Sequence, residues 1–236
     1  MSIAQNVAVI KENIARAAIE AGRDPREIKL CAATKMNDAD AVRQAIAAGV
    51  DCCGENRVQE LTAKLAQNAY EGAPIHFIGR LQTNKVKQVV GRVSLIHSVD
   101  RMNLLEAIQK EAARQGIKQD ILLQVNIGHE DSKGGFWEDE LMNILPDMSK
   151  FSNICIKGLM AIPPICENSS ANDKFFQKMY NLSVDISLKK YDNVSMDIMS
   201  MGMSDDYISA IRFGSTMIRV GTAIFGARNY TQSHPA

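Results

Sequence analysis

Eight short apolar runs alternate with segments of helical character along nearly the whole chain. Such runs, each followed by an amphipathic or polar segment, are typical of parallel β/α units. Eight units of roughly 20 to 40 residues each fall within the size range of a (β/α)8 TIM barrel, which is the fold we expect. The expected strands are residues 28–35, 50–54, 74–78, 93–97, 121–127, 154–160, 194–199 and 216–220.

Helices are expected between these strands and once before them. An N-terminal helix is indicated by Ile3, Val7, Ile10, Ile14 and Ala17, which recur at spacings of three and four. Because little chain follows the last strand, we expect this extra N-terminal helix to cover the final gap of the barrel. The other helices are expected at residues 39–48, from about 55, and at 83–90, 101–115, 138–149, 172–190 and 205–211.

A doubly wound open sheet is the competing architecture. Its dinucleotide-binding fingerprint, GxGxxG after the first strand, is missing, and Lys35 stands at that place instead. The length of 236 residues and the 46% hydrophobic content suit one large α/β domain. We therefore expect a single barrel domain over residues 1–230 and a disordered tail over residues 231–236.

Charge and targeting signals restrict the partners of the chain. Lys plus Arg and Asp plus Glu both total 27, so no long-range field attracts nucleic acid or an anionic membrane. The N-terminus lacks a basic segment followed by an apolar core, and no apolar run approaches membrane-spanning length. These features predict a cytoplasmic protein whose partners are small molecules or proteins, with no nucleic-acid or membrane binding.

The cysteines and histidines show no pattern of a redox or metal site. The five cysteines are odd in number and lack CxxC spacing, which is typical of reduced core thiols in a cytosolic protein. Cys52 and Cys53 are adjacent, but neighbouring strand residues face opposite ways, which disfavours a redox pair. The four histidines match neither HExxH nor another metal-ligand spacing, so we expect no metal site.

Lys35 is the first candidate for chemistry, because it ends the first expected strand beside apolar and small residues. Partial desolvation disfavours the charged form of an amine and makes the neutral, nucleophilic form easier to reach. Schiff-base formation needs that neutral form. The alternative is a lysine that extends from the strand end into water.

Polar residues also follow the second and third expected strands. Asn56 follows the second strand closely enough to face the barrel mouth, although a helix cap is its alternative role. His76, Gln82, Asn84 and Lys85 crowd near one opening after the third strand, and their individual roles stay open. TIM barrels carry their active residues on the loops that follow the strands, so this end of the barrel is the expected site.

The loops after the last two strands carry glycines and hydroxyl groups. In TIM barrels these two loops commonly form a phosphate site, because glycines let backbone N–H groups close on the anion. Ser200 precedes Gly202 after the seventh strand, and Gly221 precedes Thr222 after the eighth, so two hydroxyls can add hydrogen bonds. Tight turns are the alternative explanation of the glycines.

Together these groups suggest pyridoxal 5′-phosphate (PLP) as the cofactor. Lys35 would hold the aldehyde carbon, the glycine loops the phosphate, and Arg219 the ring nitrogen. A guanidinium group can only donate hydrogen bonds, so it disfavours protonation of the pyridine nitrogen. Demanding carbanion chemistry would therefore be restrained.

Several segments resemble the pyridoxal phosphate homeostasis protein family, and the resemblance spans nearly the whole chain. Two departures, Met36-Asn37-Asp38 after the lysine and Arg80 in place of a proline, concern the pocket rim. The matching segments are Thr34-Lys35, Gly54 to Glu60, His76 to Gly79 with Leu81-Gln82 and Asn84-Lys85, Gly158 to Pro163, Ser200 to Asp206, and Gly214 to Gly226.

The resemblance implies an alanine-racemase-like barrel with a defined set of cofactor contacts. Lys35 would carry the cofactor as a Schiff base, and Arg219 would face the pyridine nitrogen. The phosphate would be held by Ser200, Gly221 and Thr222. Four further residues would line the pocket: Asn56, His76, Met160 and Ser204.

The resemblance further implies a cytoplasmic carrier and regulator of the vitamin B6 pool, without established turnover. Its recipients would be PLP-dependent apo-enzymes, and its state a monomer or weak dimer. A PLP-dependent racemase or transaminase, with His76 or Lys85 as an extra acid–base group, is the second hypothesis. Alanine racemase adds a C-terminal β domain with a second base, and the chain ends at Ala236 without one, which favours the carrier. A cofactor-free barrel that forms a Schiff base with a sugar phosphate is the third hypothesis.

Overall fold

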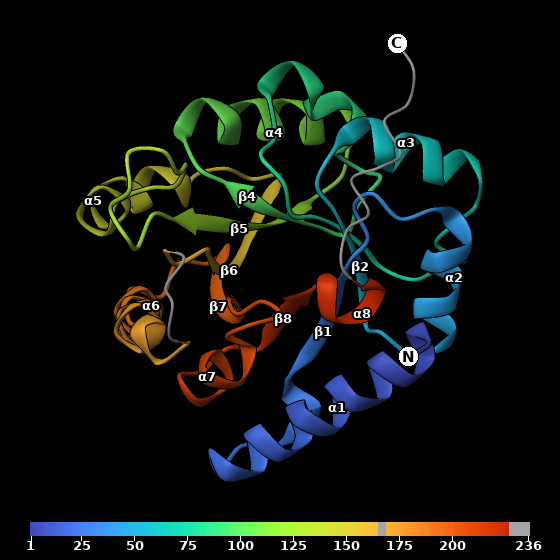
Figure 1. The fold of residues 1–236 in the computed structure, drawn as a ribbon. Coiled ribbons are helices and arrows are strands. Elements are labelled where there is room, and N and C mark those ends of the chain that lie inside the picture. Colours follow the sequence, from blue (N-terminus) through green and yellow to red (C-terminus); the bar gives the residue numbers. More distant parts are fainter. Residues whose placement is uncertain (165–168, 227–236) are drawn as a thin grey trace.

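Eight parallel strands form a closed barrel in sequence order (Figure 1), as the alternation of apolar runs predicted. The computed structural model describes residues 1–164 and 169–226, so Cys166 and the tail expected at residues 231–236 lie outside the described residues. The strands are β1 Lys29–Ala33, β2 Cys52–Glu55, β3 Ile75–Phe77, β4 Leu95–Val99, β5 Gln119–Val125, β6 Ile154–Ala161, β7 Val194–Ser200 and β8 Met217–Val220.

The barrel closes between its first and last strands. In β1, Cys31 lies opposite Cys52 of β2 on one side and opposite Arg219 of β8 on the other. Because parallel strands end at the same rim, the residues that follow β1 and β8 lie next to each other. Lys35 thus comes to the same opening as Gly221 and Thr222.

Helices surround the barrel, several of their boundaries differ from expectation by one to three residues, and two elements differ in a way that the structure explains. The helix expected from residue 55 begins at Val58, because Glu55 still pairs within β2. The helix expected at residues 83–90 is a short 3-10 helix, η2, over Thr83–Gln88. The α-helices are α1 Ile3–Glu20, α2 Ala39–Ala47, α3 Val58–Ala66, α4 Met102–Gln115, α5 Glu138–Met148, α6 Asp173–Ser187, α7 Tyr207–Arg212 and α8 Thr222–Phe225.

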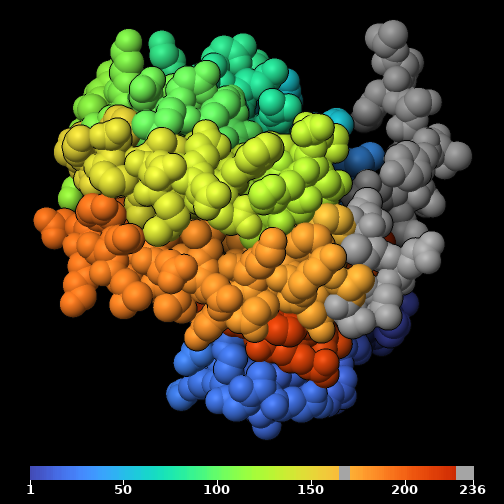
Figure 2. Space-filling model, turned by 90° about the vertical axis from the view of Figure 1, so that its left-hand side faces the viewer, coloured from blue at the N-terminus to red at the C-terminus, as the bar shows by residue number. Residues whose placement is uncertain are grey.

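The N-terminal helix α1 covers the last unit of the barrel, where α8 is only 4 residues long. Its stripe of Val7, Ile10 and Ile14 is buried, and the Asn6 side-chain amide donates to the Ile224 carbonyl at 2.8 Å. Figure 2 shows α1 in blue beneath the orange and red segments of the last units. The expected role of this helix is therefore confirmed.

Two apolar regions fill the protein. The larger lies between the barrel and the helices, and the smaller fills the barrel interior with Cys31, Cys52, Ile78, Leu95, Leu122, Met160 and Met217. A packed interior of this kind is usual for TIM barrels, whose ligands bind at the rim formed by the carboxyl ends of the strands. Within residues 1–164 and 169–226, none of the helices has the length and apolar character needed to cross a bilayer.

Candidate cofactor site

A cavity of about 480 Å³ opens at the carboxyl ends of the strands. Its size is in the range of small-molecule sites in proteins. The polar part of its wall is made by Lys35, Asn37, Asn56, Ser204, Asp205, Arg219, Gly221 and Thr222. The apolar part includes Ala33, Ile78, Ile162, Met203 and Phe225. Six of the nine predicted site residues therefore share one cavity: Lys35, Asn56, Ser204, Arg219, Gly221 and Thr222.

The chain just before Lys35 is held by a buried ion pair. Lys64 Nζ lies 2.7 Å from Glu55 Oε1 and donates to the Thr34 carbonyl at 2.7 Å. Glu55 is fully buried and also accepts hydrogen bonds from the Thr34 hydroxyl and from the Tyr70 hydroxyl. Since Thr34 is thus anchored through both its carbonyl and its hydroxyl, the backbone that presents Lys35 has a defined position.

The chain just after Lys35 is also tied down. Met36 adopts the left-handed conformation, with φ of 61°, and its N–H donates to Glu60 Oε2 at 2.7 Å. The Asn37 side-chain amide donates to the Lys35 carbonyl at 3.0 Å. Lys35 itself is half-buried and lines the cavity, so this tight turn directs its side chain into the site.

Arg219 forms the floor of the cavity from β8. Its Nη1 donates to the Ser200 carbonyl at 2.7 Å and to Ser200 Oγ at 2.6 Å, and its Nη2 donates to the Ala161 carbonyl at 2.9 Å. Burial lowers the pKa of Arg219 to about 10, with Cys31 and Asp206 acting in the opposite direction. The guanidinium therefore stays charged at neutral pH and is oriented by three uncharged oxygen atoms.

Beneath Arg219 a chain of hydrogen bonds runs into the barrel interior. Ser200 Oγ lies 3.0 Å from His97 Nδ1, and His97 Nε2 lies 3.0 Å from His76 Nδ1. Burial, the neighbouring His76 and the Arg219 charge lower the pKa of His97 well below its ordinary value, so His97 is neutral. His97 lies beneath the cavity, in contact with Ser200, and the sequence patterns did not indicate it, although it is the last residue of an expected strand.

Three predicted site residues lie below the cavity rather than on its wall. Ser200 and His76 belong to the hydrogen-bonded chain under Arg219, and Met160 is fully buried in the interior apolar cluster. Each of the three residues lies on a barrel strand. Residue spacing along a strand does not show how far below the barrel rim a side chain lies. Their direct contact with a cofactor remains a prediction, and the structure gives Ser200 a visible role in orienting Arg219.

The turns after β7 and β8 meet at one side of the cavity. Gly202 has φ of 92°, and a Cβ there would lie 2.6 Å from the Ala210 Cβ, so the turn requires glycine. Asp206 holds this turn by accepting from the Met203 N–H at 2.7 Å. Ser204 Oγ in turn accepts from the Ala223 N–H at 3.4 Å, which brings the two turns together.

Asn56 stands where the main cavity meets a second one of about 220 Å³. Helix α3 has Arg57 as its N-cap, so the helix-cap alternative for Asn56 is wrong. Asn56 Oδ1 is buried and makes no hydrogen bond within the part of the chain that the structure describes. A buried acceptor without a protein partner is destabilising, so this atom is a candidate contact for a ligand.

The cluster expected after the third strand separates in space. Gln82 and Lys85 line another cavity, together with Arg57 and Arg80, and are absent from the wall of the main one. His76 points into the barrel interior instead, toward Cys52 and His97. The expectation that these residues gather at one opening, which came from their closeness in the sequence, is therefore wrong.

Comparisons with known proteins agree on the fold. The family model of the alanine racemase N-terminal domain matches residues 5–229. A curated relative, the pyridoxal phosphate homeostasis protein of Aquifex aeolicus, is 40% identical over 230 residues, covering 98% of this chain and 100% of the relative.

Two solved structures resemble this one closely. A protein of unknown function from Bifidobacterium adolescentis has a TM-score of 0.90 at 35% identity, covering 94% of each chain. PipY of Synechococcus elongatus, solved with PLP bound, has a TM-score of 0.83 at 31% identity and covers 95% of this chain and 100% of its own. The cavity described above lies in a fold that holds PLP in that relative.

Proposed function

Because this chain belongs to the alanine racemase N-terminal domain family and, within it, to the pyridoxal phosphate homeostasis proteins, we propose that it binds PLP and buffers or carries it in the cell. The observation that carries the proposal is the shared cavity wall of Lys35, Arg219, Ser204, Gly221 and Thr222. The Lys35 amine can react with the PLP aldehyde, and the Arg219 cation can donate to the ring nitrogen. The N–H and hydroxyl groups of the turns can donate to the phosphate.

Lys35 is proposed to bind the aldehyde carbon. Its amine adds to the carbonyl, and loss of one water leaves a carbon–nitrogen double bond, the Schiff base. The hydrogen bonds that hold Thr34 and Met36, on either side of Lys35, support this role. A fixed backbone restricts the positions that the reactive nitrogen can occupy.

The phosphate is proposed to bind where the turns after β7 and β8 meet. Ser204 and Thr222 supply hydroxyl groups, and the backbone around Gly221 supplies N–H groups. Ser200 supports the same site indirectly, because its hydroxyl and carbonyl orient Arg219. Asp205 also lines the cavity and is exposed to solvent.

Arg219 is proposed to face the pyridine nitrogen. Its two terminal nitrogens are engaged by Ser200 and Ala161, and a guanidinium offers five N–H donors but never an acceptor for the ring. An unprotonated ring nitrogen is a weaker electron sink, so storage and transfer of PLP suit this site better than carbanion chemistry.

We also propose that the protein has no strong turnover of its own. The racemase or transaminase hypothesis relied on His76 or Lys85 as an extra acid–base group. His76 is buried below the cavity, and Lys85 lines a different one. Neither group lines the cavity that contains Lys35, which disfavours either of them as an acid–base group for a substrate held there.

The proposal extends to the partners and the location of the protein. PLP-dependent apo-enzymes are the proposed recipients, and a monomer or weak dimer is the proposed state. Cys31, Cys52, Cys53 and Cys155 are all free thiols, which suits the reducing cytoplasm.

The absorption spectrum of the purified protein tests the proposal. Addition of PLP to wild type should produce a Schiff-base band that borohydride removes, and mass spectrometry should then find the label on Lys35. Lys35→Ala should lack the band, while Lys85→Ala, a matched lysine on the neighbouring cavity, should keep it. Absence of the band in wild type, or a label on another lysine, would overturn the proposal.

A further inference from the structure

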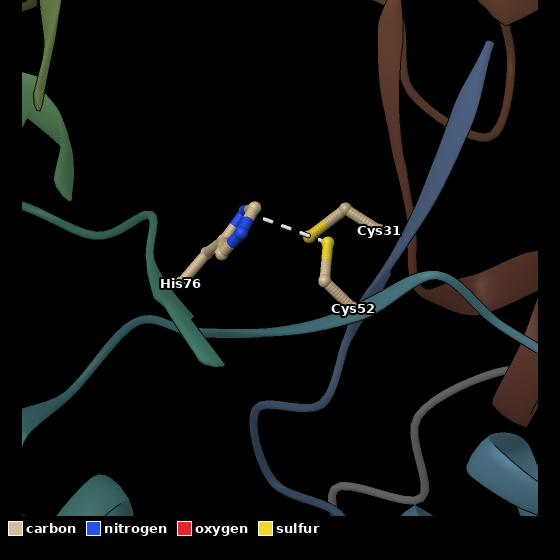
Figure 3. Close-up of side chains that lie close together, drawn as sticks. All are labelled: Cys31, Cys52 and His76. Carbon is tan, nitrogen blue, oxygen red and sulfur yellow. Dashed lines mark hydrogen bonds between the residues drawn. The ribbon is translucent and has the colours of Figure 1, made fainter. Parts of the chain in front are cut away.

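Two thiols and an imidazole converge inside the barrel, below the cofactor cavity. Cys31 comes from β1, Cys52 from β2 and His76 from β3, and Figure 3 shows their side chains pointing toward one another. The three potential ligand atoms all lie within 4.8 Å of one another. All three residues are buried, with at most 7% of any of them exposed.

A second imidazole stands beside this cluster. His97 Nε2 lies 3.0 Å from His76 Nδ1, and Cys52 Sγ lies 3.4 Å from the same His76 nitrogen. In a tetrahedral zinc site, with Zn–S near 2.3 Å and Zn–N near 2.0–2.1 Å, neighbouring ligand atoms are about 3.3 to 3.8 Å apart. The two observed distances are thus close to those of ligands on one ion.

We propose that Cys31, Cys52, His76 and His97 form a binding site for a thiophilic divalent d10 ion, Zn²⁺. Two thiolates and two imidazoles make the donor set that structural zinc sites use. Cys31, Cys52 and His76 already place their ligand atoms within 4.8 Å of one another, and His97, in contact with His76, would turn its ring toward the sulfur atoms to complete the tetrahedron.

The neighbours of His97 prepare it as a ligand. With its proton on Nδ1, His97 donates to Ser200 Oγ at 3.0 Å and keeps the lone pair of Nε2 for the ion. Ser200 Oγ is itself held by Arg219 Nη1 at 2.6 Å. Ligating histidines in proteins usually donate their other ring N–H to a fixed acceptor in this way.

Charge and surroundings also fit. Binding displaces the two thiol protons, and the resulting thiolates cancel the two positive charges of Zn²⁺. Because the ion with its ligands is then neutral, it can lie near the Arg219 guanidinium, whose residue is in register with Cys31. The same interior cluster contains Ile78, Leu95, Leu122 and Met160, which keep water away from the site.

Sequence spacing could not show this set. Cys31 and Cys52 are separated by a complete β/α unit, as are Cys52 and His76 and, again, His76 and His97. In known zinc motifs, the two ligands of a pair are separated by only about two to five residues. The expectation of no metal site came from that comparison, and only the closure of the barrel brings the four residues together.

Metal analysis of the folded protein tests the proposal. Reduced, chelator-treated protein is titrated with Zn²⁺ against a chromophoric chelator, and bound zinc is counted after gel filtration. Wild type should retain one equivalent, and Cys31→Ala and Cys52→Ala should each lose most of it. The matched control is Cys53→Ala, because Cys53 is equally buried in β2 but packs in the outer core.

Co²⁺ provides a readout on wild type that does not depend on a variant folding. One equivalent should give the intense visible bands of tetrahedral cobalt together with sulfur-to-cobalt charge transfer, and Zn²⁺ should abolish both. The proposal is overturned if wild type binds no zinc, if the cobalt spectrum is that of a hexahydrated ion, or if Cys53→Ala loses the metal as Cys31→Ala does.

The test is independent of the proposed PLP function. The Schiff-base band of metal-free protein reports on PLP alone, and zinc retention by PLP-free protein reports on the metal alone. A protein that binds PLP but no zinc refutes only the metal site. One that binds zinc but no PLP refutes only the cofactor proposal.

Discussion

Cys31 of β1 lies directly across from Arg219 of β8 in the register that closes the barrel. The pairing joins the strand that leads to Lys35 with the strand that leads to Gly221 and Thr222. A shift of this register by one residue would turn Arg219 out of the barrel, because side chains alternate along a strand. The geometry of the proposed PLP site therefore depends on this one strand pair.

Removal of the Arg219 guanidinium should destabilise the fold. Arg219→Met leaves the Ser200 and Ala161 carbonyls without this donor and removes one of the two groups that hold Ser200 Oγ, His97 being the other. Buried groups that lose a partner cost about 1–3 kcal/mol each, and we expect a total loss of about 3 kcal/mol because the region can relax. Urea unfolding measures this, with the half-exposed Arg212→Met as control. Equal unfolding midpoints for the two variants would contradict the prediction.

The Glu55–Lys64 ion pair should show strong coupling in a double-mutant cycle. Lys64→Met leaves the fully buried Glu55 carboxylate without its cation, which we expect to reduce the free energy of unfolding by about 3–5 kcal/mol. Lys64→Met combined with Glu55→Gln should recover much of that loss, since no buried charge remains. Urea denaturation of the four proteins checks this, and additive effects of the two substitutions would count against it.

Asn56→Ala should weaken ligand binding more than it weakens folding. Asn56 Oδ1 makes no hydrogen bond to the described residues, so its loss leaves no protein donor unpaired. We expect the PLP dissociation constant to rise about tenfold, the equivalent of one hydrogen bond. Fluorescence titration and thermal unfolding of the same samples separate the two effects. A large drop in Tm with unchanged PLP affinity would show that Asn56 is purely structural.

Gly202→Ala should disrupt the turn after β7. Its φ of 92° disfavours any side chain, and the new Cβ would lie 2.6 Å from the Ala210 Cβ and 3.0 Å from the Tyr207 Cα. Gly116→Ala is the matched control, since Gly116 has φ of 67° but no atom within 4 Å of a Cβ. We expect a loss of about 1 kcal/mol at Gly116 and a clearly larger one at Gly202. Comparable losses at the two sites would rule out the close contact as the cause.

Stability near α4 should depend on acid pH through Glu111. The hydrogen bonds from Arg114 and Gln115 lower the pKa of Glu111 to about 2. A carboxyl with a lowered folded-state pKa stabilises the fold above its unfolded-state pKa, near 4.5, and loses that stabilisation as pH falls through about 2. The Tm difference between wild type and Glu111→Gln should therefore be constant near pH 7 and shrink below pH 4. A difference that stays constant down to pH 2 would refute it.

Much of the architecture could be predicted from local patterns. Several strands contain runs of consecutive apolar residues because a parallel strand in a barrel is largely buried on both faces, and that burial is visible along the chain. The strand β7, with Ser195 and the exposed Asp197, is less regular. Strand ends follow from the same pattern, so local sequence was enough to predict that Lys35, Arg219, Gly221 and Thr222 share one opening. The stripe of α1 was equally visible, since a helix that packs on one side repeats every three to four residues.

Other features depended on pairing between strands. The sequence places Ser200, His76 and Cys52 on the barrel strands, but it does not say how deep each side chain lies or which of them meet. Depth is decided by the stagger of eight strands in a closed barrel, which is a property of the whole sheet. The buried ion pair of Glu55 and Lys64 was not expected either. A buried charge is tolerated only beside its partner, and that contact is formed by the fold rather than by neighbouring residues in the sequence.

The sequence alone thus determined the order of the β/α units and the set of residues at the carboxyl rim, because burial and helix periodicity are written along the chain. Tertiary structure alone decided that Asn56 lines the cavity with a buried Oδ1 that has no hydrogen-bond partner among the described residues, and that Ser200 lies beneath Arg219. It also decided that two cysteines and two histidines meet in the interior. The physical reason is that contacts between strands depend on the register of the paired strands and on the closure of the barrel. Neither property can be read from a local stretch of sequence.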